Sequence, residues 1–143
     1  MLLDANLLLY AVDVRSSAHA AAASWLERVL VGDRRVGIPW QTIGAFLRIS
    51  THPRVATNPL SSREAWQYVA SWLDTDPAWI PPATERTAAI LAQLVERHQI
   101  TANLVPDAQL AALALEHGLI VYSADTDFAR FDELRWENPL VGA

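Results

Sequence analysis

The sequence VPDAQLAALALEHGLIVYSADTDF, at residues 105–128, decides the fold class of this chain. Pro106 and Asp107 are typical of the first turn of an α-helix, where proline lacks only an amide that would be unpaired anyway and an acid complements the helix dipole. Gly118 is typical of a helix C-cap. The apolar run at 119–122 has the character of a buried strand. The stretch therefore predicts a helix that leads directly into a strand.

The same alternation extends outward through the rest of the chain. Short apolar runs predict further strands at residues 2–9, 36–38, 78–80 and 134–136, and the first of them is expected to end near Asp4. Capping serine or threonine residues and prolines predict helices at 16–30, 40–49, 61–73 and 84–98. Strands that alternate with helices indicate an α/β three-layer sandwich with a central, mostly parallel β-sheet.

Composition limits the class of protein. With 143 residues, 52% of them hydrophobic, the chain is expected to form one domain over residues 1–143. The lack of cysteine excludes disulfides, cysteine zinc sites and thiol catalysis. Residues 1–12 lack a basic leader and contain an acid, and no apolar run approaches the ~20 residues needed to cross a bilayer. We therefore expect a cytoplasmic protein that does not associate with membranes.

Charge is distributed unevenly along the chain. The formal net charge is −5, which argues against simple electrostatic binding of nucleic acid. Residues 1–72 contain seven arginines against five acids, whereas residues 73–143 contain four arginines against eleven acids. The acids are therefore concentrated in the second half of the chain.

Several aspartates are expected at one edge of the sheet. Asp4 follows the first strand, Asp125 and Asp127 follow the strand at 119–122, and Asp107 begins the preceding helix. In parallel sheets, ligands bind beyond the carboxyl ends of the strands. Carboxylates gathered there repel each other unless protons or hard cations neutralise them. Asp107 is also explained by the dipole of its helix, and a turn also explains Asp125 and Asp127. Asp4 inside an apolar strand, by contrast, is costly unless it is paired or bound to a metal.

Oxygen ligands of this kind favour Mg²⁺ or Mn²⁺. A pair of such ions ~3.5–4 Å apart can activate a water and stabilise the leaving oxygen in phosphodiester cleavage. The acids alone would suit either RNA or DNA as the substrate.

Three segments in this order resemble PIN-domain ribonucleases of the VapC toxin type. They are LLDANLLLY at 2–10, IPWQTIGAFLRIS at 38–50, and VPDAQLAALA at 105–114 with IVYSADTDF at 120–128. The resemblance implies a PIN-like fold and a magnesium-dependent endoribonuclease, with manganese as an alternative ion, that acts as the toxin of a toxin–antitoxin pair. It further implies an RNA substrate, a cognate antitoxin protein and a homodimer.

The resemblance also implies a role for each polar residue of the site. The attacking group would be a metal-activated water, with no covalent enzyme intermediate. Asp4 and Asp107 would be the primary ligands, with Asp125 as a further catalytic acid of the site and Asp127 assisting directly or through water. The residues that orient these ligands through hydrogen bonds would be Asn6 and Ser123.

The chain departs from the family pattern on the helix after the second strand. PIN domains commonly carry a glutamate there, three residues before an arginine; here Arg48 is present, but Ala45 stands at the glutamate position. The site therefore has one carboxylate fewer, which weakens the binding of a second metal ion unless Gln41 or Thr42 supplies an oxygen. An alternative function is accordingly a catalytically weak PIN-fold module that binds RNA or protein.

Cationic and aromatic residues lie next to the proposed site in sequence. Arg48, His52 and Arg54 are expected to contact RNA phosphates or an acidic antitoxin tail, although a solvated helix end explains them as well. Trp40 suits base stacking or core packing. The four histidines show no metal-ligand spacing and are expected at surface or capping positions.

Two other aspartate-centred α/β classes fit less well. A phospho-receiver domain usually needs a lysine near its acids, and the chain contains none. A haloacid-dehalogenase-like phosphatase would have a second aspartate two residues after the first, where Asn6 stands.

Overall fold

A computed structural model describes residues 1–56 and 58–141 of the chain. Its central sheet has five two-residue strands, which pair in parallel throughout, in the order β3-β2-β1-β4-β5. The strands are β1 (Leu2–Leu3), β2 (Val36–Gly37), β3 (Ala78–Trp79), β4 (Val121–Tyr122) and β5 (Trp136–Glu137). The predicted mostly parallel sheet is confirmed, and the strands are shorter than expected.

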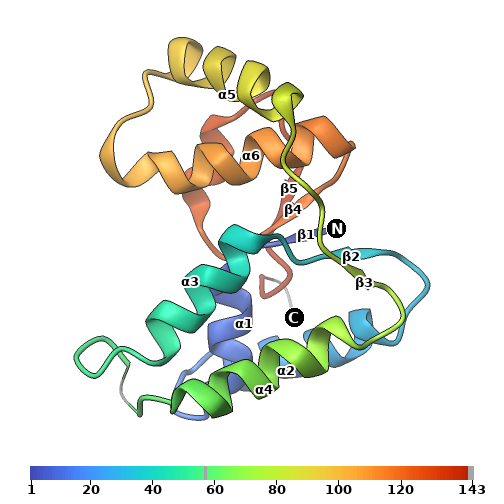
Figure 1. Ribbon diagram of the computed structural model, residues 1–143, viewed down its shortest axis with the longest axis vertical. Helices are drawn as coiled ribbons and strands as arrows, with labels where there is room; N and C mark the ends of the chain where they lie inside the picture. Colours follow the sequence, from blue (N-terminus) through green and yellow to red (C-terminus); the bar gives the residue numbers. More distant parts are fainter. Residues whose placement is uncertain (57, 142–143) are drawn as a thin grey trace.

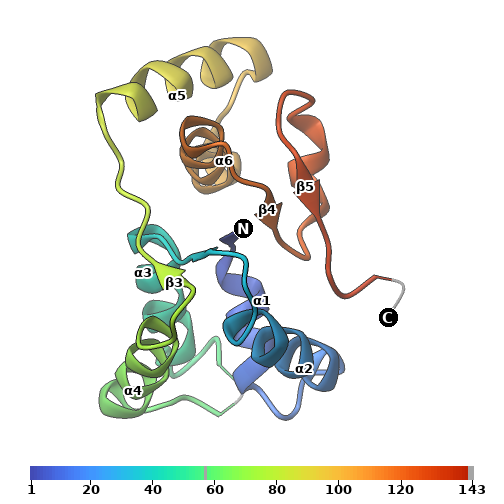
Figure 2. The same ribbon diagram turned by 90° about the vertical axis from the view of Figure 1, so that its right-hand side faces the viewer.

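Helices cover the sheet on both sides. One group lies in the lower half of Figure 1 and consists of α1 (Ala5–Val12), α2 (His19–Leu30), α3 (Trp40–Ser50) and α4 (Ser62–Leu73). The other group lies in the upper half and consists of α5 (Glu85–His98) and α6 (Val105–His117). Short 3₁₀ turns lie at η1 (Ala102–Leu104) and η2 (Thr126–Arg130). Figure 2 shows the sheet between the two groups, which confirms the three-layer sandwich.

Two apolar cores lie on opposite faces of the sheet. Successive strand residues point to opposite faces, so Leu3 and Tyr122 pack with α1–α4, whereas Leu2 and Val121 pack with α5 and α6. Because both faces are covered, the central strands β1 and β4 are apolar without alternation. No helix in the described parts of the chain is long and apolar enough to cross a membrane.

The first strand ends at Leu3, near Asp4 as expected, but the remainder of the apolar run at residues 2–9 does not belong to a strand. Asp4 is extended and caps α1, accepting a hydrogen bond from the backbone N–H of Ala5. Leu7 and Leu8 are therefore buried on a helix rather than in a strand. A short apolar run does not distinguish a buried strand from a buried helix by periodicity.

Most predicted helix ends are confirmed. α3 begins directly after Pro39, and α4 is capped by Ser61 and Glu64 in a reciprocal capping box. α6 ends at Gly118, whose φ of 65° lies in the left-handed region that favours glycine. α2 begins at His19 and not at Ser16, because the Ser16 hydroxyl accepts the N–H of Ala18 in the preceding turn.

Candidate functional site

Asp4 lies at the carboxyl edge of the central strand β1. Its Oδ1 accepts the N–H of Ala5 at 2.7 Å, and its Oδ2 accepts the Ser123 hydroxyl at 2.7 Å and the Asn6 amide at 3.3 Å. Burial raises the pKa of Asp4, the hydrogen bonds from Ser123 and Ala5 lower it in part, and the negative charge of Asp125 raises it further. The carboxylate is thus held in one orientation and is costly to ionise without a cation.

Ser123 connects the ends of β1 and β4. It is fully buried, and its hydroxyl oxygen accepts the Asn6 amide at 3.0 Å and the backbone N–H of Asp125 at 2.9 Å. Asn6 in turn accepts the N–H of Ala124 at 3.3 Å. These hydrogen bonds are of the orienting kind that the resemblance implied for Asn6 and Ser123, and they join residues far apart in the sequence.

Asp107, Asp125 and Asp127 form a compact group of carboxylates. One oxygen from each lies within 4.8 Å of the others. Asp125 caps η2, and its Oδ1 accepts the N–H of Asp127 at 2.8 Å. Burial, followed by the negative charges of Asp125, Asp4 and Asp127, raises the pKa of Asp107 to about 7. All four predicted acids therefore gather at one edge of the sheet.

Asp4, Asp107, Asp125 and Asp127, called the acid cluster below, offer ligands that fit a hard divalent cation. Every side chain of the acid cluster is a carboxylate, and Mg²⁺ and Mn²⁺ prefer oxygen ligands. Mutual repulsion among the carboxylates is the electrostatic condition that such an ion relieves.

α3 contributes an anchor to this edge and no carboxylate. The Thr42 hydroxyl, which is 2% exposed, donates to the carbonyl of Leu3 at 2.7 Å. Its hydrogen is thereby committed to the end of β1, immediately before Asp4. Gln41 is exposed, and Ala45 is partly buried one turn after Thr42. The missing glutamate is not replaced by another acid on this helix.

Sequence reasoning missed one further contact to the site. The Trp136 indole N–H, on β5, donates to the carbonyl of Ser123 at 3.0 Å. Trp136 and Thr42 thus hold the backbone at the ends of β4 and β1, respectively. A single tryptophan carries no sequence signal for such a role, because core packing explains it equally well.

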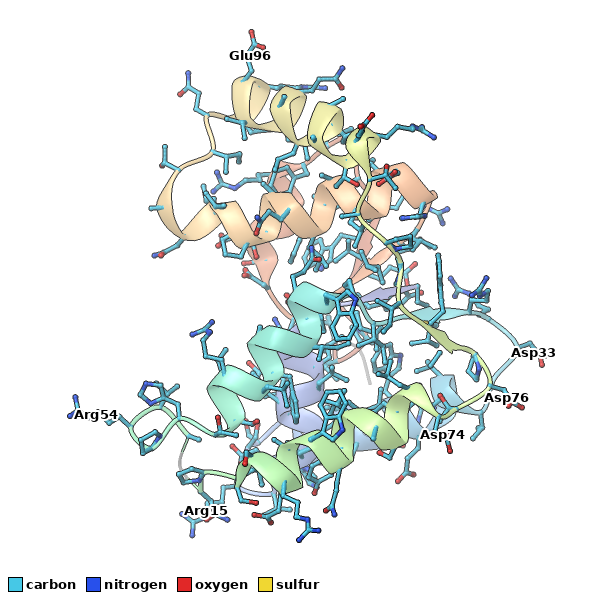
Figure 3. The ribbon with its side chains drawn as sticks, in the orientation of Figure 1. Arg15, Asp33, Arg54, Asp74, Asp76 and Glu96 are labelled. Atoms are coloured by element: carbon cyan, nitrogen blue, oxygen red, sulfur yellow. The ribbon has the colours of Figure 1, made fainter. Side chains whose placement is uncertain are left out.

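The predicted cationic residues lie along and beyond the far end of α3. Arg48 is exposed in its last turn. His52 Nδ1 accepts the N–H groups of Arg54 and Val55, so this histidine caps its own loop. Arg54 is exposed and lies at the outer edge of the molecule in Figure 3. With 11 residues at about 1.5 Å each, α3 is about 16 Å long, and this loop follows its C-terminal end.

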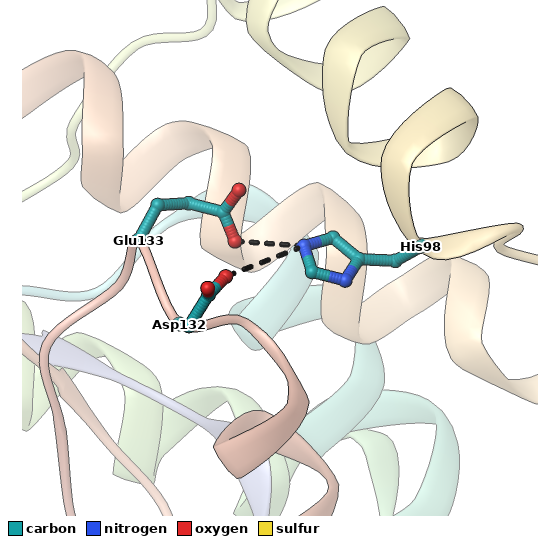
Figure 4. Close-up of side chains that lie close together, drawn as sticks. All are labelled: His98, Asp132 and Glu133. Atoms are coloured by element: carbon teal, nitrogen blue, oxygen red, sulfur yellow. Dashed lines mark hydrogen bonds and ion pairs between the residues drawn. The ribbon is translucent and has the colours of Figure 1, made fainter.

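A second group of acids lies near the end of α5. His98 Nε2 lies 2.8 Å from Glu133 Oε1 and 4.0 Å from Asp132 Oδ1 (Figure 4). Arg97 pairs with the same acids at 2.9 and 3.2 Å. Because the Arg97 guanidinium contacts both carboxylates, we interpret this group as an ion-pair cluster. The expectation of a surface or capping role is wrong for His98, whose side chain is only 13% exposed and packs edge-on against Phe131.

Comparison with known proteins agrees with this geometry. The PIN domain family profile matches residues 1–134. Ribonuclease VapC37 of Mycobacterium tuberculosis is 42% identical, and the alignment covers 96% of both chains. Among solved structures, Mycobacterium tuberculosis VapC20, a Sarcin-Ricin loop cleaving toxin, has a TM-score of 0.69 at 16% identity and covers 94% of this chain and 98% of its own. A toxin–antitoxin complex from Klebsiella pneumoniae has a TM-score of 0.64 at 18% identity, with 96% of each chain covered. The chain therefore belongs to the PIN domain family and, within it, to the VapC proteins.

Proposed function

We propose that this chain is a metal-dependent endoribonuclease that acts as the toxin of a toxin–antitoxin pair. The observation that carries the proposal is the gathering of Asp4, Asp107 and Asp125 at one sheet edge, with Asp4 held by buried hydrogen bonds. The ribonuclease name of its 42% identical relative supports RNA as the substrate.

In this proposal the acids bind Mg²⁺ or Mn²⁺. Asp4, Asp107 and Asp125 are the direct ligands, and Asp127 assists directly or through water. When bound, the ion supplies Lewis-acid chemistry that makes water a nucleophile at neutral pH.

The chain's own residues prepare the site for that chemistry. Ser123 and Asn6 fix Oδ2 of Asp4, and Ala5 fixes Oδ1, so the remaining lone pairs of the carboxylate are directed by the protein. Asp107 is partly protonated near neutral pH when no cation is present, because its pKa is raised to about 7. Binding of the ion must displace that proton, which couples metal affinity to pH.

RNA and a cognate antitoxin are the proposed macromolecular partners. Arg48 and Arg54 are exposed and free to contact phosphates or an acidic antitoxin tail, whereas His52 contributes through the shape of the loop. The toxin–antitoxin complex that shares this fold supports the antitoxin. A homodimer is part of the same proposal.

The second candidate is a PIN-fold module that binds RNA or protein without efficient cleavage. Ala45 favours it, because α3 provides no carboxylate to the site. This candidate has the same fold and the same cationic residues as the endoribonuclease and differs from it only in the rate of RNA cleavage.

Cleavage of a labelled RNA by the wild type, by Asp4→Asn and by the exposed control Asp33→Asn separates the two candidates. We expect magnesium-dependent cleavage by the wild type and the control, its loss in EDTA, and its loss in Asp4→Asn. Equal RNA binding by all three proteins, with no cleavage by any, would establish the binding module. Expression in a bacterial host should arrest growth with the wild type and not with Asp4→Asn.

A further inference from the structure

The most exposed aromatic side chain described in this chain lies on α3. Trp40, the first residue of the helix, is 61% exposed, compared with 47% for Trp66 and 39% for Tyr68. The alternative of core packing for Trp40 is therefore wrong. A single exposed apolar residue is common and needs no explanation by itself. The residues that surround Trp40 on α3 indicate a binding role for it.

Trp40 shares an exposed face of α3 with Gly44 and Arg48. Residues four apart lie above one another on a helix, and all three are exposed. A Cβ placed on Gly44 would have no neighbour within 4 Å, so nothing fills the space between the indole and the guanidinium. About 12 Å of helix axis separates Trp40 from Arg48. The face thus presents an aromatic ring, an open patch and a cation in line.

The first turn of α3, which carries Trp40, lies at the sheet edge that also carries the acid cluster. Thr42, in the first turn, contacts the carbonyl immediately before Asp4, so the beginning of α3 is fixed at the edge that carries the acids. The helix then leads away from that edge toward Arg54, which Figure 3 shows at the outer margin. A strand bound along this face would have one end near that edge of the sheet.

The charge of the segment that contains α3 favours the binding of a polyanion. Residues 36–63 contain Arg48, Arg54 and Arg63 and no acidic residue, although the chain as a whole has a net charge of −5. Single-stranded nucleic acids bind to surfaces that combine cations for the phosphates with aromatic rings on which bases stack. An acidic peptide would use the arginines equally well but gives no reason for an exposed indole at the start of this helix.

We infer that the Trp40–Gly44–Arg48 face of α3 binds the single-stranded RNA substrate, with one base stacked on Trp40 and the backbone led along Arg48 away from the acid cluster. This inference rests on the proposed function and adds the path of the substrate to it.

The test measures binding of a fluorescent single-stranded RNA oligonucleotide by polarisation, in the non-cleaving Asp4→Asn background. Trp40→Ala should raise Kd by roughly 5- to 150-fold, the range for loss of one stacked base. Trp40→Phe should retain most of the affinity, and the matched control Trp66→Ala should bind as the background protein does. Arg48→Ala should lower the salt slope of binding by about 0.7, the value for one phosphate contact on a single strand.

Three outcomes would overturn the inference. If Trp40→Ala binds RNA as tightly as the background while wild-type protein cleaves RNA, the substrate path is wrong and the nuclease proposal stands. If Trp40→Ala converts a dimer to a monomer in sedimentation and Trp40→Phe does not rescue RNA binding, the face is an interface between copies of this chain. If the wild type neither binds nor cleaves RNA, the proposed function fails together with the inference. Circular dichroism of each variant verifies that it is folded.

Discussion

Asp107→Asn should stabilise the metal-free protein at alkaline pH while it removes a proposed metal ligand. The carboxyl group is partly buried among Asp125, Asp4 and Asp127, and its pKa is raised from 3.8 to about 7. The folded state therefore binds this proton more tightly than the unfolded state does. Its stabilising contribution is complete below about pH 4 and is lost as the pH rises toward 7.

The size of the effect follows from the same shift. A rise from 3.8 to about 7 corresponds to an upper bound of about 4 kcal/mol in the free energy of unfolding. Because the side chain is partly exposed, solvent screening reduces this to about 1–2 kcal/mol. The asparagine has a similar shape and no charge, so it should recover that amount at pH 8 and almost nothing at pH 4.

Urea unfolding in EDTA at these two pH values measures the difference. The midpoint for Asp107→Asn should rise by about 0.5–1 M at pH 8, given an m-value of about 2 kcal/mol/M. Addition of Mg²⁺ should stabilise the wild type more than the variant, because the ion binds the folded state through this carboxylate. Asp33→Asn, at an exposed position that Figure 3 shows at the outer edge of the molecule, is the control. A variant that is no more stable than the wild type at pH 8, or that gains equally at both pH values, would refute the reasoning.

Three further substitutions test the supports of the site. Thr42→Val leaves the Leu3 carbonyl buried without a donor. It should lower the free energy of unfolding in urea by about 1–3 kcal/mol and the Mn²⁺ affinity in calorimetric titration by about 10- to 100-fold. Thr42→Ser should restore both. Trp136→Phe should remove the hydrogen bond to Ser123 and cost about 1 kcal/mol in urea unfolding, and an unchanged midpoint would contradict that role. Ala45→Glu adds a carboxylate where the family commonly has one. It should tighten Mn²⁺ binding and raise RNA cleavage, and weaker binding would show that α3 does not face the ion.

Local signals in the sequence were sufficient for most of the fold. Pro39, Gly118 and the Ser61–Glu64 pair act through backbone geometry and hydrogen bonds within a few residues, so their effect is readable without tertiary contacts. The sequence did not reveal that the apolar run continues as a helix after Asp4, because a short apolar run looks the same in a buried strand and in a buried helix.

The acid cluster was predictable for a topological reason. Parallel strands bring their carboxyl ends to one edge, so Asp4 and Asp125 were expected at the same edge, and the pairing of β1 with β4 in the structure brings them near each other. The contacts of Thr42 and Trp136 were not predictable, since each depends on how distant elements pack. The exposure of Trp40 could not be read from the sequence either, because an indole at a helix start suits the core and the surface equally.

Asp4 serves two purposes with one side chain. It begins α1 through the N–H of Ala5, and it also presents oxygen to the acid cluster. Truncation to alanine would remove the cap and the charge together, so a loss of cleavage in an alanine scan could not be attributed to either. Asparagine caps helices about as well as aspartate but is not a carboxylate. At this position only the exchange of acid for amide separates chemistry from architecture, and the same holds wherever a ligand also starts a helix.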